Sequence, residues 1–317
     1  MKVLALDGGY GDNKIVYGEF GSIKNMFKFI TAAAEVKLND MVTDRRVITY
    51  RDHSFYVGKD ALNVQSSSII DVKGYEQLEF FAPIFLASAL QQLQVVPDVI
   101  VLGLSIAQIQ NSGHFRANIE DFMRKSGCAA KIVIVPQGAV AKLAIDTYGM
   151  SFPSNTKEFS PESSYILGDM GFNTLDLCHV INGVASSNMI RGIEGRGATL
   201  IVQDVVVDIK EKHGITLNLS EGKSVLDTGI LKRRGVSYEV KDIIEKARGV
   251  YIENLKTIIE NEFGEILDKV DNLFIVGGGA YILDPNSTGN GFVRAPSASA
   301  EYYNAIGMFL HGNRVGK

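Results

Sequence analysis

Two short segments of the sequence place an aspartate and glycines at the end of an apolar run. Residues 4–6 lead into Asp7-Gly8-Gly9-Tyr10-Gly11, and residues 166–168 lead into Asp169-Met170-Gly171. Glycine adopts positive φ and has no side chain to block close approach, so a glycine-rich turn lets backbone N–H groups converge on an anion. An aspartate beside such a turn can hold a hydrated Mg²⁺ that neutralises phosphate charge. We therefore expect the two turns to clamp one phosphate ligand, with Asp7 and Asp169 as metal ligands through water.

Three further observations bear on this prediction. Lys14, in the strand that leaves the first turn, can reach back toward a β- or γ-phosphate as a point charge. Either turn alone is read more simply as an ordinary hairpin, because Asp-Gly is a common hairpin signal. Their presence in both halves, with a third cluster at Gly277-Gly278-Gly279, favours the phosphate site. The sequence has no GxxxxGK[ST], and its first glycine cluster is no GxGxxG opening a helix, which excludes P-loop and dinucleotide-fold sites.

The elements around these turns alternate between extended and helical patterns, which predicts an α/β fold. Residues 150–163 are rich in proline and serine and are interpreted as the linker between two halves. We expect strands at 3–6, 14–20, 99–104, 132–135, 165–168, 174–180, 183–190 and 273–276, and helices at 76–93, 112–124, 197–213, 240–263 and 298–310, with another between 138 and 149.

The overall composition argues against a surface built for nucleic acid or membrane. The 317 residues carry a formal net charge of −4, so direct DNA binding is not expected. The one basic run, Lys232-Arg233-Arg234, is interpreted as a solvated turn. The sequence shows no signal peptide and no apolar run long enough to span a membrane, so we expect a soluble, cytoplasmic protein.

The order of these motifs resembles that of the actin/Hsp70/sugar-kinase superfamily. Within it, residues 6–14 and 166–171 are most similar to the ParM/StbA plasmid-segregation actins and their short archaeal relatives. The resemblance implies a ribonuclease H-like fold of two similar α/β halves around a nucleotide cleft. It divides the chain into a first domain, 1–150, with 31–68 as a small subdomain and 299–317 returning to it, and a second domain, 164–298. Its motifs fall on 5–17 and 166–180 (phosphate), 137–149 and 299–310 (connecting helices), and 275–283 (adenosine).

The resemblance also implies roles for individual residues. ATP or ADP would bind with Mg²⁺ between the halves. The implied catalytic set is Gln137, which would orient the attacking water, with Asp7 and Asp169, which would hold Mg²⁺ through water. The alternative for Gln137 is a helix N-terminal residue without a role. The implied nucleotide contacts are Gly8, Gly9, Tyr10, Gly11, Asp12, Asn13, Lys14, Met170, Gly171, Phe172, Asn173, Glu221, Lys223, Gly277, Gly278, Gly279 and Tyr281. Many relatives carry a second glycine or a small hydroxyl residue where this chain has 170–173, so fewer amides are expected to reach the phosphates here.

The function implied is that of a slow, filament-forming ATPase. Such a protein would segregate plasmid or other DNA through an adaptor protein, with hydrolysis destabilising the polymer. Two alternatives stay open at this point. A sugar or acid kinase on the same fold would need a carboxylate base in the first half. The sequence offers no convincing candidate, because it does not fix whether Asp98 and Asp121 face the cleft. The other alternative is an ATP switch that does not form filaments.

Overall fold

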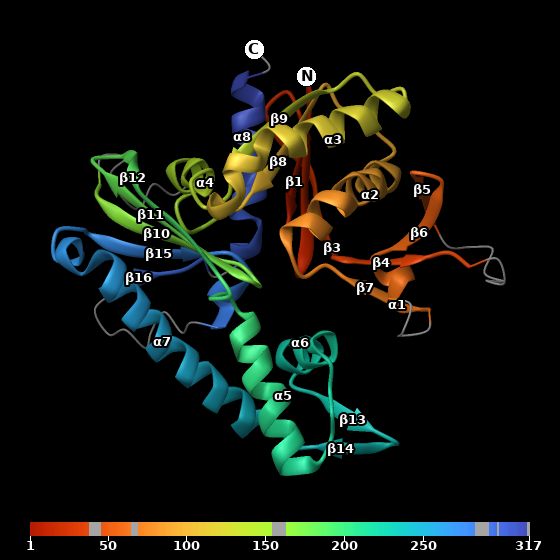
Figure 1. Ribbon diagram of the computed structural model, residues 1–317. Helices are drawn as coiled ribbons and strands as arrows, with labels where there is room; N and C mark the ends of the chain where they lie inside the picture. Colours follow the sequence, from red (N-terminus) through yellow and green to blue (C-terminus); the bar gives the residue numbers. More distant parts are fainter. Residues whose placement is uncertain (38–45, 65–68, 154–162, 283–291, 297, 316–317) are drawn as a thin grey trace.

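The fold is built from two five-stranded sheets with helices around and between them (Figure 1). The computed structural model describes residues 1–37, 46–64, 69–153, 163–282, 292–296 and 298–315. The first sheet has the order β3-β2-β1-β8-β9, and the second has the order β12-β11-β10-β15-β16. The two orders correspond strand for strand, so the halves share one topology, as the α/β prediction and the repeated turn motif implied.

β1 is the central strand of the first sheet. β1 pairs antiparallel with β2 and parallel with β8. Its interior residues are buried on both faces, which suits a central strand made of Val, Leu and Ala. The bounds are β1 Lys2–Gly8, β2 Asp12–Glu19, β3 Ser22–Ile30, β8 Val99–Leu104 and β9 Lys131–Pro136.

The second sheet repeats this arrangement around β10. β10 pairs antiparallel with β11 and parallel with β15, and Asp169 occupies the place in β10 that Asp7 has in β1. Across the hairpins, Asp7 lies opposite Lys14, whereas Asp169 lies opposite Asp176. The bounds are β10 Tyr165–Met170, β11 Thr174–Ile181, β12 Val184–Glu194, β15 Asn272–Val276 and β16 Val293–Arg294.

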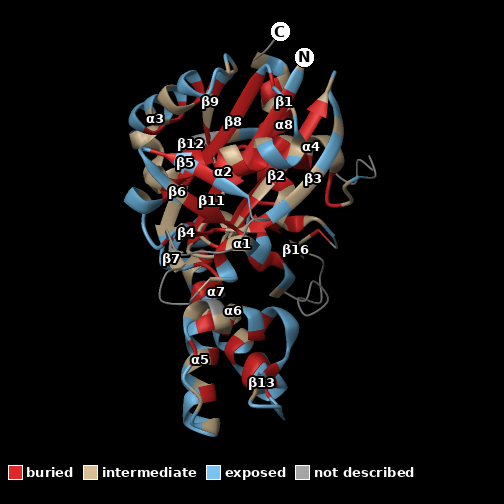
Figure 2. Cartoon of the chain, turned by 90° about the vertical axis from the view of Figure 1, so that its right-hand side faces the viewer, coloured by how far each residue is buried: buried red, intermediate tan, exposed pale blue. Residues whose placement is uncertain are grey.

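Helices cover both sheets and fill the space between them. α2 (Tyr75–Leu93) and α3 (Ser112–Lys125) pack on one face of the first sheet. α4 (Ala141–Tyr148) and α8 (Tyr303–Val315) share a core with both sheets. α5 (Thr199–His213) and α7 (Lys241–Leu267) cover the second sheet. Figure 2 shows the buried residues running through the strands of the main body.

Two smaller units complete the described structure. A four-stranded sheet of order β5-β6-β4-β7, with α1, lies beside the first sheet. A lobe of α6 and the β13–β14 hairpin lies at the end opposite the chain termini (Figure 1). The bounds are β4 Ala32–Glu35, β5 Val47–Tyr50, β6 His53–Val57, α1 Lys59–Leu62, β7 Ile69–Asp71, α6 Leu219–Thr228, β13 Leu231–Arg233 and β14 Val236–Tyr238, with short 3₁₀ segments η2 Ile106–Asn111, η3 Gly278–Ile282 and η5 Ala300–Tyr302.

The structure differs from the expected elements in several places. The strand β3 and the hairpin β13–β14 were not anticipated, because neither has a long apolar run. The strands β4–β7 of the small sheet were not predicted individually. Gln137 lies in a turn that precedes α4 by several residues, so it is no helix residue. The central parts of the small subdomain and of the linker, 38–45, 65–68 and 154–162, lie outside the described residues. In the described part of the chain, every helix is too short or too polar to cross a membrane.

Candidate functional site

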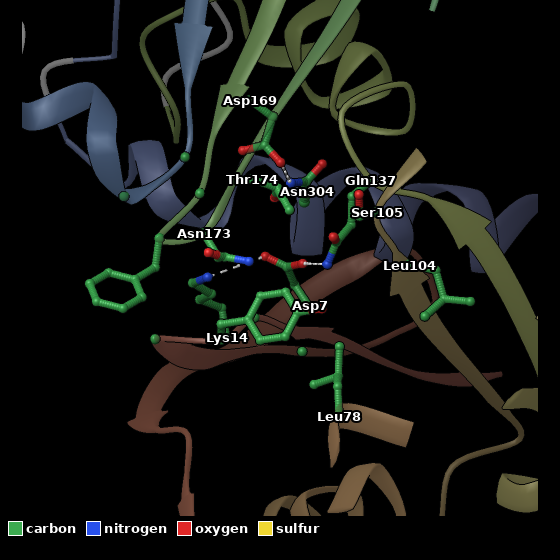
Figure 3. Close-up of a pocket in the computed structure, with 18 of the residues that line it drawn as sticks. Asp7, Lys14, Leu78, Leu104, Ser105, Gln137, Asp169, Asn173, Thr174 and Asn304 are labelled. Atoms are coloured by element: carbon green, nitrogen blue, oxygen red, sulfur yellow. Dashed lines mark hydrogen bonds and ion pairs between the residues drawn. The ribbon is translucent and has the colours of Figure 1, made fainter. Parts of the chain in front are cut away.

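The ends of β1 and β10 open on one cleft between the two sheets. Its walls include both glycine turns, together with Gln137, Asn304 and residues of 277–278. Figure 3 shows Asp169 entering from one side and Asp7 from the other, with Gln137 and Lys14 on either side of Asp7. The structure therefore brings together the two aspartates that the sequence analysis placed at the centre of the site.

Gln137 and Lys14 hold the Asp7 carboxylate, one at each of its two oxygen atoms. The Asp7 residue is only 3% exposed. Gln137 Nε2 donates to its Oδ1 over 2.6 Å, and Lys14 Nζ lies 3.7 Å from its Oδ2. Burial raises the pKa of Asp7, and Lys14 and Gln137 oppose part of that rise.

Asp169 is fixed by the C-terminal helix. Asn304 Nδ2 donates to its Oδ2 over 2.6 Å, and Asn304 Oδ1 accepts a hydrogen bond from the Gly138 amide over 2.9 Å. Burial, and then the nearby charge of Asp7, raise the pKa of Asp169 to about 6. The Asp169 side chain can lie here because residue 277 is a glycine. The φ of Gly277 is +87°, and a Cβ atom there would lie 2.4 Å from Asp169 Oδ1.

The two carboxylates fit a hydrated divalent cation. Both are buried, burial raises the pKa of each, and the charge of Asp7 raises the pKa of Asp169 further. Among the described residues, Lys14 is the only cation paired with either of them. A second positive charge between them would offset this repulsion, and oxygen ligands of this kind are those that Mg²⁺ prefers.

The first turn is tight, and its glycines are needed for space. The Gly9 amide donates to Asp12 O over 3.2 Å, which leaves Tyr10 and Gly11 as the two central residues. None of the three glycines at 8, 9 and 11 has positive φ, so that part of the sequence argument was wrong. A Cβ atom at Gly9 would lie 3.0 Å from Lys14 Nζ, and one at Gly11 would lie 3.1 Å from Phe172 Cβ. Close approach of neighbours therefore explains Gly9 and Gly11, whereas a Cβ atom at Gly8 would come no closer than 3.4 Å to a neighbour.

The second turn has the same form. The Gly171 amide donates to Thr174 O over 3.0 Å, so Phe172 and Asn173 are its central residues, and both line the cleft. Met170 is fully buried, and its side chain packs beneath Gly279. A nucleotide contact from this residue would have to come from its backbone.

Two other residues with an expected nucleotide contact are engaged elsewhere. Asn13 is fully buried and donates its Nδ2 to Thr31 Oγ1 over 2.9 Å, beneath the first turn. Glu221 closes the N-terminal capping box of α6 with Asn218 and pairs with Arg233 over 2.5 Å. Neither side chain lines the described walls of the cleft.

A second hollow adjoins the first on the side of α5, α6 and α7. It is lined by apolar residues and by both acidic and basic side chains, and Gly11, Phe172 and Gly278 border both hollows. The remaining predicted contacts fall here, namely Asp12, Lys223, Gly279 and Tyr281. Lys223 Nζ lies 3.6 Å from Asp12 and 2.9 Å from Asp227, so it joins the first turn to α6.

Several residues at the site were missed in the sequence analysis. Asn304 is a polar residue within an apolar helical stripe, and this contrast could have identified it from the sequence. Glu301 accepts from Tyr281 and pairs with Lys28 over 3.1 Å, closing the edge of the second hollow. Asp176 is fully buried between the halves: Ser105 Oγ donates to its Oδ1 over 3.2 Å, and its Oδ2 has no partner among the described residues. Burial and Asp169 raise its pKa well above the usual range.

Two sheets of equal topology, with a buried aspartate from each at a shared cleft, define an actin-type α/β fold. Comparison with known proteins agrees with this description of the fold. Residues 5–139 match the family described as actin-like proteins, N-terminal domain, and residues 167–287 match the archaeal actin homologue MreB-like family, C-terminal. The chain belongs to the actin-like superfamily. No curated protein sequence matches it.

Solved structures with the same fold match over nearly the whole chain. The archaeal actin homologue Ta0583 has a TM-score of 0.76 at 16% identity, covering 99% of this chain and 100% of its own. A 15-stranded ParM filament from Clostridium botulinum has a TM-score of 0.75 at 19% identity, covering 99% of both chains. Bacillus thuringiensis ParM with ATP has a TM-score of 0.64 at 16% identity, covering 100% of this chain and 99% of its own. At these identities the likeness establishes the fold.

Proposed function

We propose that this chain is a slow ATPase that assembles into filaments in the cytoplasm and moves plasmid or other DNA through an adaptor protein. The observation that carries the proposal is the pair Asp7 and Asp169, buried on opposite sides of a cleft walled by both glycine turns. Similar structures include an archaeal actin homologue with ADP, a ParM with ATP and a ParM filament. A net charge of −4 is consistent with reaching DNA through an adaptor.

The two hollows suggest how the nucleotide would lie. Its phosphates would fit beside Lys14 and the two turns, where backbone amides and a lysine offer positive charge. Its nucleoside would fit the adjoining hollow, between the apolar side chains of α5 and α6 and the side chain of Tyr281. Domains 1–150 and 164–298 would then enclose it, a division supported by sheets that use residues 2–136 and 165–294 respectively.

In this proposal Gln137 orients a water molecule. Its Nε2 is held by Asp7, so its Oε1 is the atom left to accept a hydrogen bond from water. A carboxamide cannot take the proton, so it contributes by positioning, and hydrolysis is expected to be slow. A Mg²⁺ ion held through water by Asp7 and Asp169 would neutralise charge on the phosphates.

Neither of the two aspartates considered as the base of a kinase lies at the cleft. Asp98 is exposed near the N-terminus, where its Oδ2 accepts from the Lys2 amide over 2.6 Å. Asp121 pairs with Arg124 and Lys125 on the surface of α3. Neither aspartate lines the described walls of the cleft.

Assembly and phosphoryl transfer can be measured on the same preparation. We expect light scattering and pelleted protein to rise after addition of Mg-ATP, with filaments in electron micrographs and slow release of phosphate. Transfer of phosphate to members of a sugar and carboxylic-acid panel, without assembly, would favour the kinase. Nucleotide binding and hydrolysis without assembly would favour a switch that does not polymerise.

A further inference from the structure

A third hollow lies where the small four-stranded sheet meets the first sheet and α2. We call it the junction hollow, and its volume is about 250 Å³. β3, the start of β5, the segment from β6 into α1, and α2 all contribute to its walls. Figure 1 shows β5 and β6 beside α2 in this part of the molecule. The polar residues that line the junction hollow are Lys28, Arg46, Lys59, Asp60, Ser88 and Gln92.

Positive charge predominates around the junction hollow. Lys28, Arg46 and Lys59 are cationic, and Asp60 is the one carboxylate among the described lining residues. Arg46 and Lys59 are exposed, and within the described part of the chain neither forms an ion pair. A hollow lined mainly by one sign of charge concentrates its field and attracts the opposite charge. The junction hollow is therefore suited to an anion.

α2 adds a buried hydroxyl group to this wall. Ser88 is only 6% exposed, and its Oγ accepts a hydrogen bond from Gln92 Nε2 over 3.3 Å. Its hydroxyl proton has no acceptor among the described residues, whereas Thr147 on α4 donates to the carbonyl of Leu143 one turn earlier. A hydroxyl group can donate one hydrogen bond and accept others at the same time. Ser88 is thus free to donate to a ligand oxygen in the hollow.

We propose that the junction hollow binds a small phosphate monoester. Arginine, lysine and hydroxyl donors are the groups that recognise phosphate oxygens. The volume falls just below the range of about 300–1,000 Å³ that is usual for drug-sized ligands, so a metabolite with only a few carbon atoms fits best. The buried side chains of Phe29, Ile48 and Val57 also line the hollow and would pack against those carbon atoms.

Lys28 links this site to the proposed nucleotide site. It lines both the junction hollow and the second hollow of the cleft. There its Nζ lies 3.1 Å from Glu301 Oε1, and Glu301 accepts from Tyr281. One ammonium group cannot serve both sites fully, so the two ligands would compete for it. This part of the inference rests on the proposed function, and it predicts that each ligand weakens the binding of the other by the same factor.

Calorimetric titration of the nucleotide-free protein with glycerol 3-phosphate tests the site. We expect binding at millimolar concentrations, weakened at least about tenfold in the double variant Arg46→Gln with Lys59→Gln, because two of the three cations are lost. Ser88→Ala should weaken it about fivefold through loss of one hydrogen bond. The matched control is Lys24→Gln with Arg116→Gln, which removes the same charge from exposed positions outside the hollow and should bind like the wild type.

Two results of the titration would overturn the proposed site. One is no binding by the wild type. The other is equal binding by the double variant and its control, since glycerol 3-phosphate would then be held elsewhere, for example at the glycine turns. Both variants change exposed side chains, so their folding is expected to match that of the wild type.

Nucleotide affinity tests the link through Lys28. Saturating glycerol 3-phosphate should raise the Kd for a fluorescent ATP analogue at least about fivefold in the wild type and leave it unchanged in Lys28→Gln. An unchanged Kd in the wild type would overturn the coupling. A protein that binds glycerol 3-phosphate but no nucleotide would refute the proposed function and support the anion site. Nucleotide binding without glycerol 3-phosphate binding would refute the anion site alone.

Discussion

Asn304 on the C-terminal helix donates to Asp169 at the end of β10 over 2.6 Å, across 135 residues of sequence. The same side chain accepts from the Gly138 amide, next to Gln137. One buried amide thus ties the carboxylate of the second half to the turn that carries Gln137. The position of Asp169 therefore depends on α8 being docked between the sheets.

Asn304→Ala should lower both stability and turnover. The change leaves a buried carboxylate and a buried amide without partners, so we expect a loss of about 2 kcal/mol in the free energy of unfolding. ATP hydrolysis should fall about tenfold, because Asp169 would no longer be held. Asn313→Ala is the matched control, since Asn313 lies on the same helix and, within the described part of the chain, donates to Phe309 O and not to the cleft. Wild-type turnover in Asn304→Ala would show that the contact has no part in positioning.

Asp169→Ala should reduce hydrolysis at least about tenfold, which corresponds to about 1.4 kcal/mol of barrier. The reason is loss of one of the two buried carboxylates that face the cleft. Steady-state phosphate release at saturating Mg-ATP is the measurement. Asp121→Ala, which removes an exposed carboxylate on α3, should leave the rate unchanged. If both variants turn over at the wild-type rate, the catalytic assignment is wrong.

Gln137→Ala should separate turnover from binding. Loss of the oriented acceptor is expected to lower kcat by about 10- to 100-fold, while the Kd for ATP changes little. Gln137→Glu should also be slow, because a second carboxylate would face Asp7 without donating to it. Single-turnover hydrolysis and equilibrium titration would measure the two quantities. A parallel loss of affinity would mean that Gln137 contacts the nucleotide directly.

The strands and turns at the centre of the site could be predicted from local sequence. β1 and β10 are apolar runs that end at an aspartate, and their glycine turns repeat in both halves. This repetition was enough to predict two similar halves and a shared cleft. The α7 helix was likewise visible as a long apolar stripe.

The remaining contacts depend on tertiary packing that no local pattern records. Asn304 reaches Asp169 only because α8 returns between the two sheets. Glu221, an expected nucleotide contact, closes the capping box of α6 and pairs with Arg233, and neither contact was predicted from the sequence. Asp176 replaces the lysine of the first hairpin, and its burial follows from contact with Ser105 in the other half. These roles require the register and the arrangement of the two sheets.

The nucleotide-free protein should be less stable at pH 7.5 than at pH 5 through Asp169. Its pKa is about 6 in the folded protein and 3.8 in the unfolded reference, so the folded state binds more protons between these values. Stability therefore falls as pH rises through this window, by about 1 kcal/mol from pH 5 to 7.5 for this group. Urea unfolding at the two pH values should show a smaller difference for Asp169→Asn than for the wild type. An equal difference in both proteins would contradict the assignment.

Gly277→Ala should damage the site beyond the cost of its backbone conformation. Its φ is +87°, and the added Cβ would lie 2.4 Å from Asp169 Oδ1 and 2.6 Å from Met170 O. Gly229→Ala is the matched control, because Gly229 has φ of +67° with no atom within 4 Å of an added Cβ. The control should lose about 1 kcal/mol of unfolding free energy, the cost of a left-handed alanine, and keep its hydrolysis rate. Gly277→Ala should lose about 2 kcal/mol more by overpacking and hydrolyse ATP at least about tenfold more slowly, because Asp169 must move. Equal stability loss in the two variants, with normal hydrolysis in both, would show that Gly277 serves only its turn and does not hold Asp169 in place.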